Sequence, residues 1–174
     1  MKKWNTYAKI LGNHTAALLT GIATDGPYTT HSLEPPEDRP FFELAARITF
    51  EGVLAETRQK GRGHIVCGVV NLTNDRPLLK DMAAYLGLGA DALETENGPQ
   101  NILNEFLNVV IGLAGSTWSE HGFAINFSTP RALSGQPMPP PAPDHQSFHV
   151  VVSSPHGLQV DILVVFREYG RPAA

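Results

Sequence analysis

The stretch from Pro99 to Gly112, PQNILNEFLNVVIG, constrains the fold most, because its polar residues recur at helical spacing. At about 100° per residue, its polar set falls within roughly 60° on a helix: Asn101, Glu105, Asn108 and Gly112. Apolar residues occupy the other sides and are expected to face a core: Ile102, Phe106, Val109, Val110 and Leu113. The stretch therefore predicts an amphipathic helix with a narrow polar stripe.

The contents of this stripe are unusual for a surface helix. A solvated face usually carries Lys, Arg and several Glu, which are good helix formers, whereas Asn and Gly are poor ones. Two readings stay open from the stripe alone. It is either an ordinary solvent face, or a surface on which function keeps Asn and Gly in place.

Two further helices are expected. Apolar residues at helical spacing predict a first helix over residues 4–22, which ends before Gly26-Pro27. A second helix starts after Asp75, a candidate N-cap, and ends at Gly87 and Gly89. Asn97-Gly98-Pro99 is a similar start signal for the central helix.

The remaining apolar segments are typical of strands. One or two strands are expected within 41–56, and the others at 65–72, 122–127, 147–153 and 158–166. The first and last pairs of these segments are expected to be antiparallel hairpins, with basic residues in the turn at 58–63. Antiparallel pairs and long helices together predict an α+β fold, and the chain 1–174 is expected to be a single domain because no linker divides it.

Composition excludes several classes of protein. The chain has 174 residues, of which 42% are hydrophobic and 17% charged, as in a globular domain. The net charge of −4 argues against nucleic acid as a partner. A lone cysteine, Cys67, lies in an apolar run, so a reduced cytoplasmic protein without disulfides is expected. No apolar run is long enough to span a membrane.

The sequence contains no evident nucleophile, metal cage or cofactor motif. Its seven histidines include no His-Glu-x-x-His pattern of a zinc peptidase. His145 and His149 share one face of a predicted strand, but about 13 Å apart at the usual rise, which is too far for one metal. The Pro-rich segment from Pro137 to Pro143 is expected to be an extended surface loop.

With Glu105, Asn108 and Pro130 considered together, the sequence resembles the CheX-type chemotaxis phosphatases of the CheC/CheX/FliY group. That family has Glu-x-x-Asn on a helix, an Asp or Ser four residues before the Glu, and a Pro a little over twenty residues after the Asn. Here the Pro follows at 130 − 108 = 22 positions, and Gly112 stands where the family often has Gly. The resemblance covers roughly residues 4 to 167.

The resemblance implies a CheC/CheX-like fold and hydrolysis of the aspartyl phosphate on a CheY-like response-regulator receiver domain. Asn108 would position the attacking water, and Glu105 would contact the receiver's Lys. Asn101, Gly112 and Pro130 would help to bind this substrate. No cofactor of the chain's own is implied, since Mg²⁺ is expected on the partner receiver.

The resemblance also implies a homodimer and leaves an alternative function open. Some relatives keep the fold as non-catalytic receiver-binding or flagellar-switch modules. Two features depart from the family pattern. Position 101 is Asn rather than Asp or Ser, and the Pro137–Pro143 segment is longer than the usual connection.

Overall fold

The computed structural model describes residues 2–33, 41–133 and 143–169. Its helices are α1 (Lys2–Ile22), α2 (Arg76–Tyr85), the short 3₁₀ helix η1 (Ala92–Glu94) and α3 (Gly98–Glu120). Its strands are β1 (Thr29–Leu33), β2 (Leu44–Leu54), β3 (Lys60–Val69), β4 (Phe123–Phe127), β5 (Arg131–Leu133), β6 (Gln146–Ser153) and β7 (Gln159–Tyr169).

The described strands form one antiparallel sheet in the order β1-β6-β7-β3-β2-β4, and β5 also pairs with β2. Both predicted hairpins are confirmed, since β2 pairs with β3 and β6 with β7. The hairpins join through β3 and β7, where Ile65 lies opposite Val164. The predicted α+β class with a mostly antiparallel sheet is therefore confirmed.

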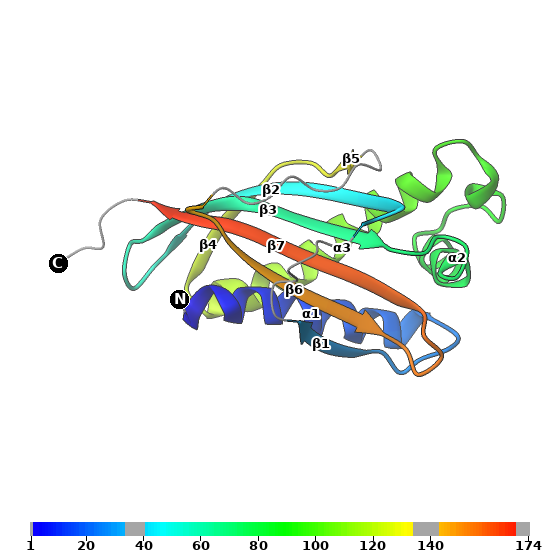
Figure 1. Cartoon of the computed structure of the whole chain (residues 1–174), viewed down its shortest axis with the longest axis horizontal. Coiled ribbons are helices and arrows are strands. Elements are labelled where there is room, and N and C mark those ends of the chain that lie inside the picture. The colour runs from blue at the N-terminus through cyan, green and yellow to red at the C-terminus, as the bar shows by residue number, and fades with distance from the viewer. Residues whose placement is uncertain (1, 34–40, 134–142, 170–174) are drawn as a thin grey trace.

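The helices α1 and α3 pack against each other and against one face of this sheet. In Figure 1 the strands β6 and β7 pass in front of α1, and α2 lies near the end at which α3 begins. The rings of Tyr7 and Trp118 stack with centroids 4.3 Å apart, and Trp118 Nε1 donates to the Tyr7 carbonyl oxygen at 3.2 Å. At Gly12, a Cβ would lie 2.7 Å from Val150 Cγ1, so glycine lets α1 approach β6 closely.

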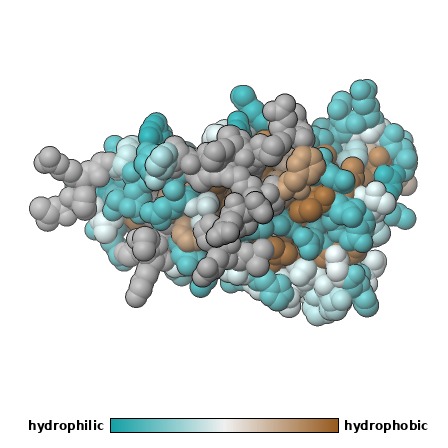
Figure 2. Space-filling model, viewed as in Figure 1, coloured by the Kyte–Doolittle hydropathy of each residue, from teal (hydrophilic) through white to brown (hydrophobic). Residues whose placement is uncertain are grey.

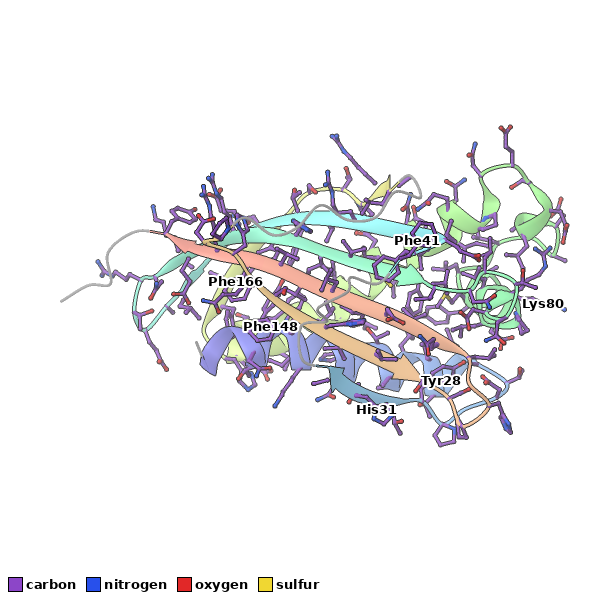
Figure 3. All side chains as sticks on the ribbon, viewed as in Figure 1. Tyr28, His31, Phe41, Lys80, Phe148 and Phe166 are labelled. Carbon is purple, nitrogen blue, oxygen red and sulfur yellow. The ribbon has the colours of Figure 1, made fainter. Side chains whose placement is uncertain are left out.

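The side chains of β6 and β7 that face the helices continue the same core. Phe148 and Phe166 stack there with centroids 5.6 Å apart (Figure 3). Cys67 is buried in β3, as its apolar surroundings predicted, and burial raises the pKa of its thiol to about 12. Figure 2 shows the side of the molecule on which the strands lie in front of α1. Where its residues are coloured, this side is largely hydrophilic, and hydrophobic residues reach the surface only in small groups.

Several strand boundaries differ from the sequence predictions. The segment 41–56 holds one strand, β2, and β3 starts at Lys60, so most of the predicted basic turn is strand. β7 continues to Tyr169, past the predicted strand end at residue 166. Its pairing with β3 accounts for this, because Lys60 lies opposite Tyr169. Long-range pairing thus overrides the local turn signal of Gly61 and Gly63.

Two short strands were missed altogether. β1 consists mostly of polar residues and lies outside the predicted strands, but it pairs with β6 along its whole length. β5 follows Pro130 and pairs with β2 at Ala45 to Arg47. Neither strand has the alternating apolar pattern by which a strand is found in a sequence. Each is held mainly by backbone pairing at a sheet edge, which local sequence does not reveal. The Pro137–Pro143 segment lies, apart from Pro143, outside the described residues.

Asp75 occupies the N-cap position of α2, as predicted, but its side chain does not cap the helix. Its Oδ1 instead accepts hydrogen bonds from the backbone N–H of Gln159 at 3.1 Å and from Asn74 Nδ2 at 3.2 Å. Asp75 therefore ties the start of α2 to the start of β7. Burial raises the pKa of this carboxyl, against the lowering effect of its hydrogen bonds.

This raised pKa predicts how Asp75→Asn changes the pH dependence of stability. Because the folded pKa lies above the unfolded value of about 3.9, folding takes up a proton and wild-type stability falls as pH rises through the folded pKa. The amide keeps the oxygen that accepts from Gln159 and removes the charge. We expect the free energy of unfolding of the variant to gain on wild type from about pH 4, near the unfolded pKa, to about pH 8.

Urea unfolding at both pH values measures this gain. Asp91→Asn, an exposed Asp at the N-cap of η1, is the matched control. Equal pH dependence in wild type and Asp75→Asn would contradict the buried-charge explanation.

Candidate functional site

The polar stripe predicted from the sequence lies on α3 and faces solvent. Asn101, Glu105, Asn108 and Gly112 are all exposed, while Ile102 and other apolar residues on the opposite sides are buried. The helix thus presents these four residues together on one surface, and the predicted amphipathic pattern is confirmed.

One residue of the predicted apolar set was placed wrongly. Leu113 is 43% exposed, although Ile102 and Phe106, on the same side of the helix, are fully buried. The structure packs α2 and η1 against α3, and Figure 1 places α2 near its start. Leu113 lies in the later part of the helix, where it stays accessible beside Val109, which is half-buried.

Glu105 is the only charged residue of the stripe, and α3 contains no Lys or Arg. Within the described ranges, no hydrogen bond or ion pair engages the side chains of Glu105, Asn108 or Asn101. A carboxamide that is free in this way can donate and accept hydrogen bonds at once. The stripe can therefore offer one carboxylate and two amides to a bound partner without breaking internal bonds.

Gly112 is not required by packing inside the chain. A Cβ built at Gly112 or at Gly115, one turn later, would meet nothing within 4 Å. Glycine in a helix interior costs roughly 0.5–1 kcal/mol relative to alanine. Packing within the described chain therefore does not explain why glycine, rather than a better helix former, stands at position 112.

Pro130 lies on a different element from the stripe. It is half-buried in the short link between β4 and β5. Both of these strands pair with β2 and pack against α3. The structure thus places Pro130 at the sheet edge that adjoins α3, while the other four predicted residues share the helix itself.

The structure adds a side-chain contact that sequence reasoning missed. Gln100 Nε2 donates to the backbone carbonyl oxygen of Ala45 in β2 and to Asn104 Oδ1, both at 2.9 Å. Gln100 and Asn104 are half-buried and lie at the edge of the stripe. The only signal in the sequence was their spacing of four residues, at which helical side chains meet.

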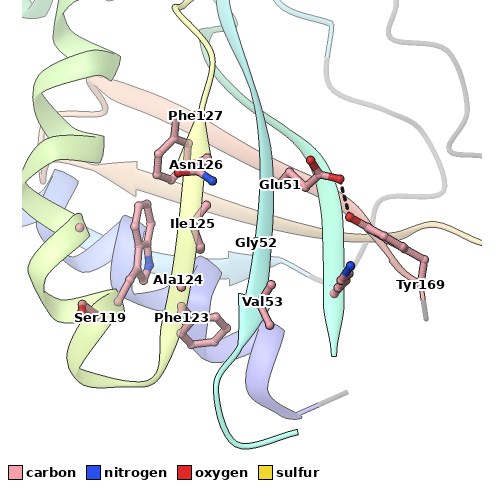
Figure 4. Close-up of a pocket in the computed structure, with 13 residues that line it drawn as sticks. Glu51, Gly52, Val53, Ser119, Phe123, Ala124, Ile125, Asn126, Phe127 and Tyr169 are labelled. Atoms are coloured by element: carbon pink, nitrogen blue, oxygen red, sulfur yellow. Dashed lines mark hydrogen bonds between the residues drawn. The ribbon is translucent and has the colours of Figure 1, made fainter. Parts of the chain in front are cut away.

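A surface hollow lies elsewhere on the described chain. It has a volume of about 610 Å³ and lies around β4 near the end of α3 (Figure 4). Trp118 and Ser119 line it on one side, and Glu51 and Tyr169 on the other. The Tyr169 hydroxyl donates to Glu51, and this hydrogen bond raises the pKa of Tyr169. None of the stripe residues lines this hollow. They are exposed on one side of α3, and an open helix surface suits a protein partner better than a small molecule.

The histidines do not form a metal site in the described ranges, where no group of three or more metal-binding side chains occurs. His149 is buried and its Nε2 donates to Asp161 Oδ2 at 2.7 Å. His145 precedes β6 and contacts Asp144 instead. In the same ranges, no helix is both long and apolar enough to cross a bilayer.

Solved structures with a similar fold include proteins that are distant in sequence. A chemotactic CheC-like protein from Shewanella oneidensis MR-1 matches with a TM-score of 0.64 and 17% identity, over 91% of this chain and 96% of that one. The chain has the CheC/CheX-like fold. No family model matches this chain, and no curated relative does.

Two further structures show what else shares this CheC/CheX-like fold. CheX of Borrelia burgdorferi, in a complex with CheY, BeF3 and Mg²⁺, matches with a TM-score of 0.60 and 12% identity, over 92% of this chain and 97% of that one. The FliM middle domain of H. pylori matches with a TM-score of 0.56 and 10% identity, over 96% of this chain and 92% of that one.

The open surroundings of the helix glycines lead to a stability prediction. Gly112→Ala and Gly115→Ala should each raise the free energy of unfolding by roughly 0.5–1 kcal/mol, because the helix gains a better former and no contact is lost. Urea unfolding followed by far-UV circular dichroism measures this. Destabilisation by either variant would show that the position is packed, against the observed geometry.

Proposed function

We propose that this chain is a phosphatase that hydrolyses the aspartyl phosphate of a CheY-like response-regulator receiver domain. The observation that carries the proposal is the exposure of Glu105 and Asn108 side by side on α3, with neither side chain engaged inside the described chain. The fold shared with a CheX that binds CheY supports this partner class.

The reaction asks little of the protein beyond positioning. Water attacks the phosphorus in line, the bond from phosphorus to the aspartyl oxygen breaks, and the products are inorganic phosphate and a free carboxylate on the receiver. The receiver's own Mg²⁺ would supply charge stabilisation at the phosphoryl group. The phosphatase chain therefore needs no nucleophile or metal.

Each residue of the stripe has a role in this proposal. The Asn108 carboxamide accepts a hydrogen bond from the water through its oxygen or donates one to it through its nitrogen, which holds the water in line. Glu105, one turn earlier, pairs with the receiver's Lys and orients the docked surfaces. Gly112 lets the receiver approach the helix backbone, while Asn101 and Pro130 extend the contact.

The decisive experiment measures the decay of a phosphorylated CheY-like receiver with and without this protein. We expect acceleration by wild type, and a loss on the order of 10²-fold in Asn108→Ala, because a misplaced water costs about that much. Asn126→Ala, an exposed Asn on β4 outside the stripe, is the matched control and should keep full activity. Equal acceleration by wild type and Asn108→Ala would refute the water-positioning role.

The similarity to the FliM middle domain favours one alternative, a non-catalytic receiver-binding or flagellar-switch module. Such a module would bind the receiver activated by BeF3 and leave the decay of its phosphorylated form unchanged. Binding measured by calorimetry together with unchanged decay would select this alternative.

We further propose that the chain forms a homodimer by pairing of sheet edges. β4 ends the strand order on one side and has the sequence FAINF, without charge or proline, so it lacks the features that usually block edge pairing. Light scattering after size exclusion should show a dimer for wild type. Ala124→Lys, at an exposed position of β4, should shift it towards monomer.

Ser32→Lys, at an exposed position of the opposite edge strand β1, is the matched control for the dimer experiment and should remain dimeric. A monomeric wild type would refute the dimer. The reverse pattern in the two variants would place the interface at β1.

A further inference from the structure

The contact of Gln100 with Ala45 and Asn104 determines how the Asn104 amide is oriented. The Ala45 carbonyl oxygen can only accept a hydrogen bond, so Gln100 must present its amide nitrogen to it. The same nitrogen has a second proton, and Asn104 must then present its oxygen to receive it. The orientation of both amides follows from a backbone acceptor in β2.

This arrangement leaves the Asn104 nitrogen with two free N–H donors. Its Nδ2 takes part in no hydrogen bond in the part of the chain that the structure describes. The side chain is half-buried, and its rotamer is already held by Gln100. A donor whose conformation is set before binding loses little entropy when it meets an acceptor.

Asn104 lies next to the proposed reaction site. It precedes Asn108 by four residues, so the two side chains are neighbours on the helix surface. Each step of four residues turns a helix by about 40°, and Gln100, Asn104 and Asn108 therefore lead from the side facing β2 to the exposed stripe. The fixed amide thus stands between the sheet and Asn108.

We propose that Asn104 is an additional hydrogen-bond donor of the site, held by Gln100 as a positioning residue, and that its Nδ2 donates to a phosphoryl oxygen of the phosphorylated receiver. The inference rests on the proposed function. It is carried by the geometry above and by the charge of α3, which offers a phosphoryl dianion Glu105 but no Lys or Arg. Oriented amide donors are what remains on this helix to offset that negative charge.

Asn104→Asp is the sharpest test, because it keeps size and shape. The carboxylate still accepts from Gln100, so the contact with β2 is preserved, but the Nδ2 donor is lost. We expect the KM for the phosphorylated receiver to rise and kcat/KM to fall about tenfold or more, with the free energy of unfolding unchanged.

Ser116→Asp controls for the added charge, because Ser116 is exposed on the same helix and belongs to no proposed contact. It should lower kcat/KM by less than twofold at moderate ionic strength, where exposed charges are screened. Equal losses in Ser116→Asp and Asn104→Asp would overturn the proposal, since charge alone would explain both.

Gln100→Leu tests the positioning role. It should lower kcat/KM several-fold by freeing the Asn104 side chain, and it should have no further effect in an Asn104→Ala background. Additive losses would mean that Gln100 acts independently of Asn104, and they would overturn the proposed positioning role of Gln100. Urea unfolding of each variant separates these effects from general destabilisation.

The outcomes separate this inference from the proposed function. If wild type accelerates decay, Asn108→Ala does not, and Asn104→Asp matches wild type, then the inference fails while the phosphatase stands. If wild type does not accelerate decay, the phosphatase fails. Binding of the receiver activated by BeF3 then decides the inference, which predicts at least tenfold weaker binding by Asn104→Asp and is refuted by equal binding.

Discussion

The exposure of the polar stripe depends on the burial of the opposite side of α3. Phe106, Val110 and Trp118 are almost fully buried in the hydrophobic core. Burying a Val or Phe side chain contributes about 1.5–3 kcal/mol. That stabilisation fixes the rotation of the helix about its axis. It also offsets the cost of Asn and Gly, which are poor helix formers, on the exposed side.

The sheet determines where this helix can lie. The strands β7 and β3 join the two hairpins into one surface, and α1 and α3 pack on the same face of it. Gly12 allows the close approach of α1 to β6, and the Tyr7–Trp118 stack joins the two helices. The contact of Gln100 with Ala45 then connects the first turns of α3 to β2, so the proposed site rests on regular structure rather than on loops. Such a support suits a reaction whose rate depends on the placement of one water.

The same arrangement explains why no deep pocket is needed. In the proposed function the phosphorylated group belongs to a folded protein, so the surface that meets it must be accessible rather than enclosed. Exposed Leu113, half-buried Val109 and the uncovered Gly112 give α3 apolar and flat contact area around its few polar groups. The hollow around β4 lies at another part of the molecule and has no part in the proposed chemistry.

The sequence by itself determined the amphipathic character of α3, the two hairpins and the exposed grouping of Asn101, Glu105, Asn108 and Gly112, because these depend on periodicity within a short stretch. Only the tertiary structure decided the exposure of Leu113, the pairing of β1 and β5, and the use of Asp75 as a link to β7. Each of these depends on a partner distant in the sequence. The orientation of Asn104 belongs to the same group, since it is set by a carbonyl oxygen of β2 that no local pattern reveals.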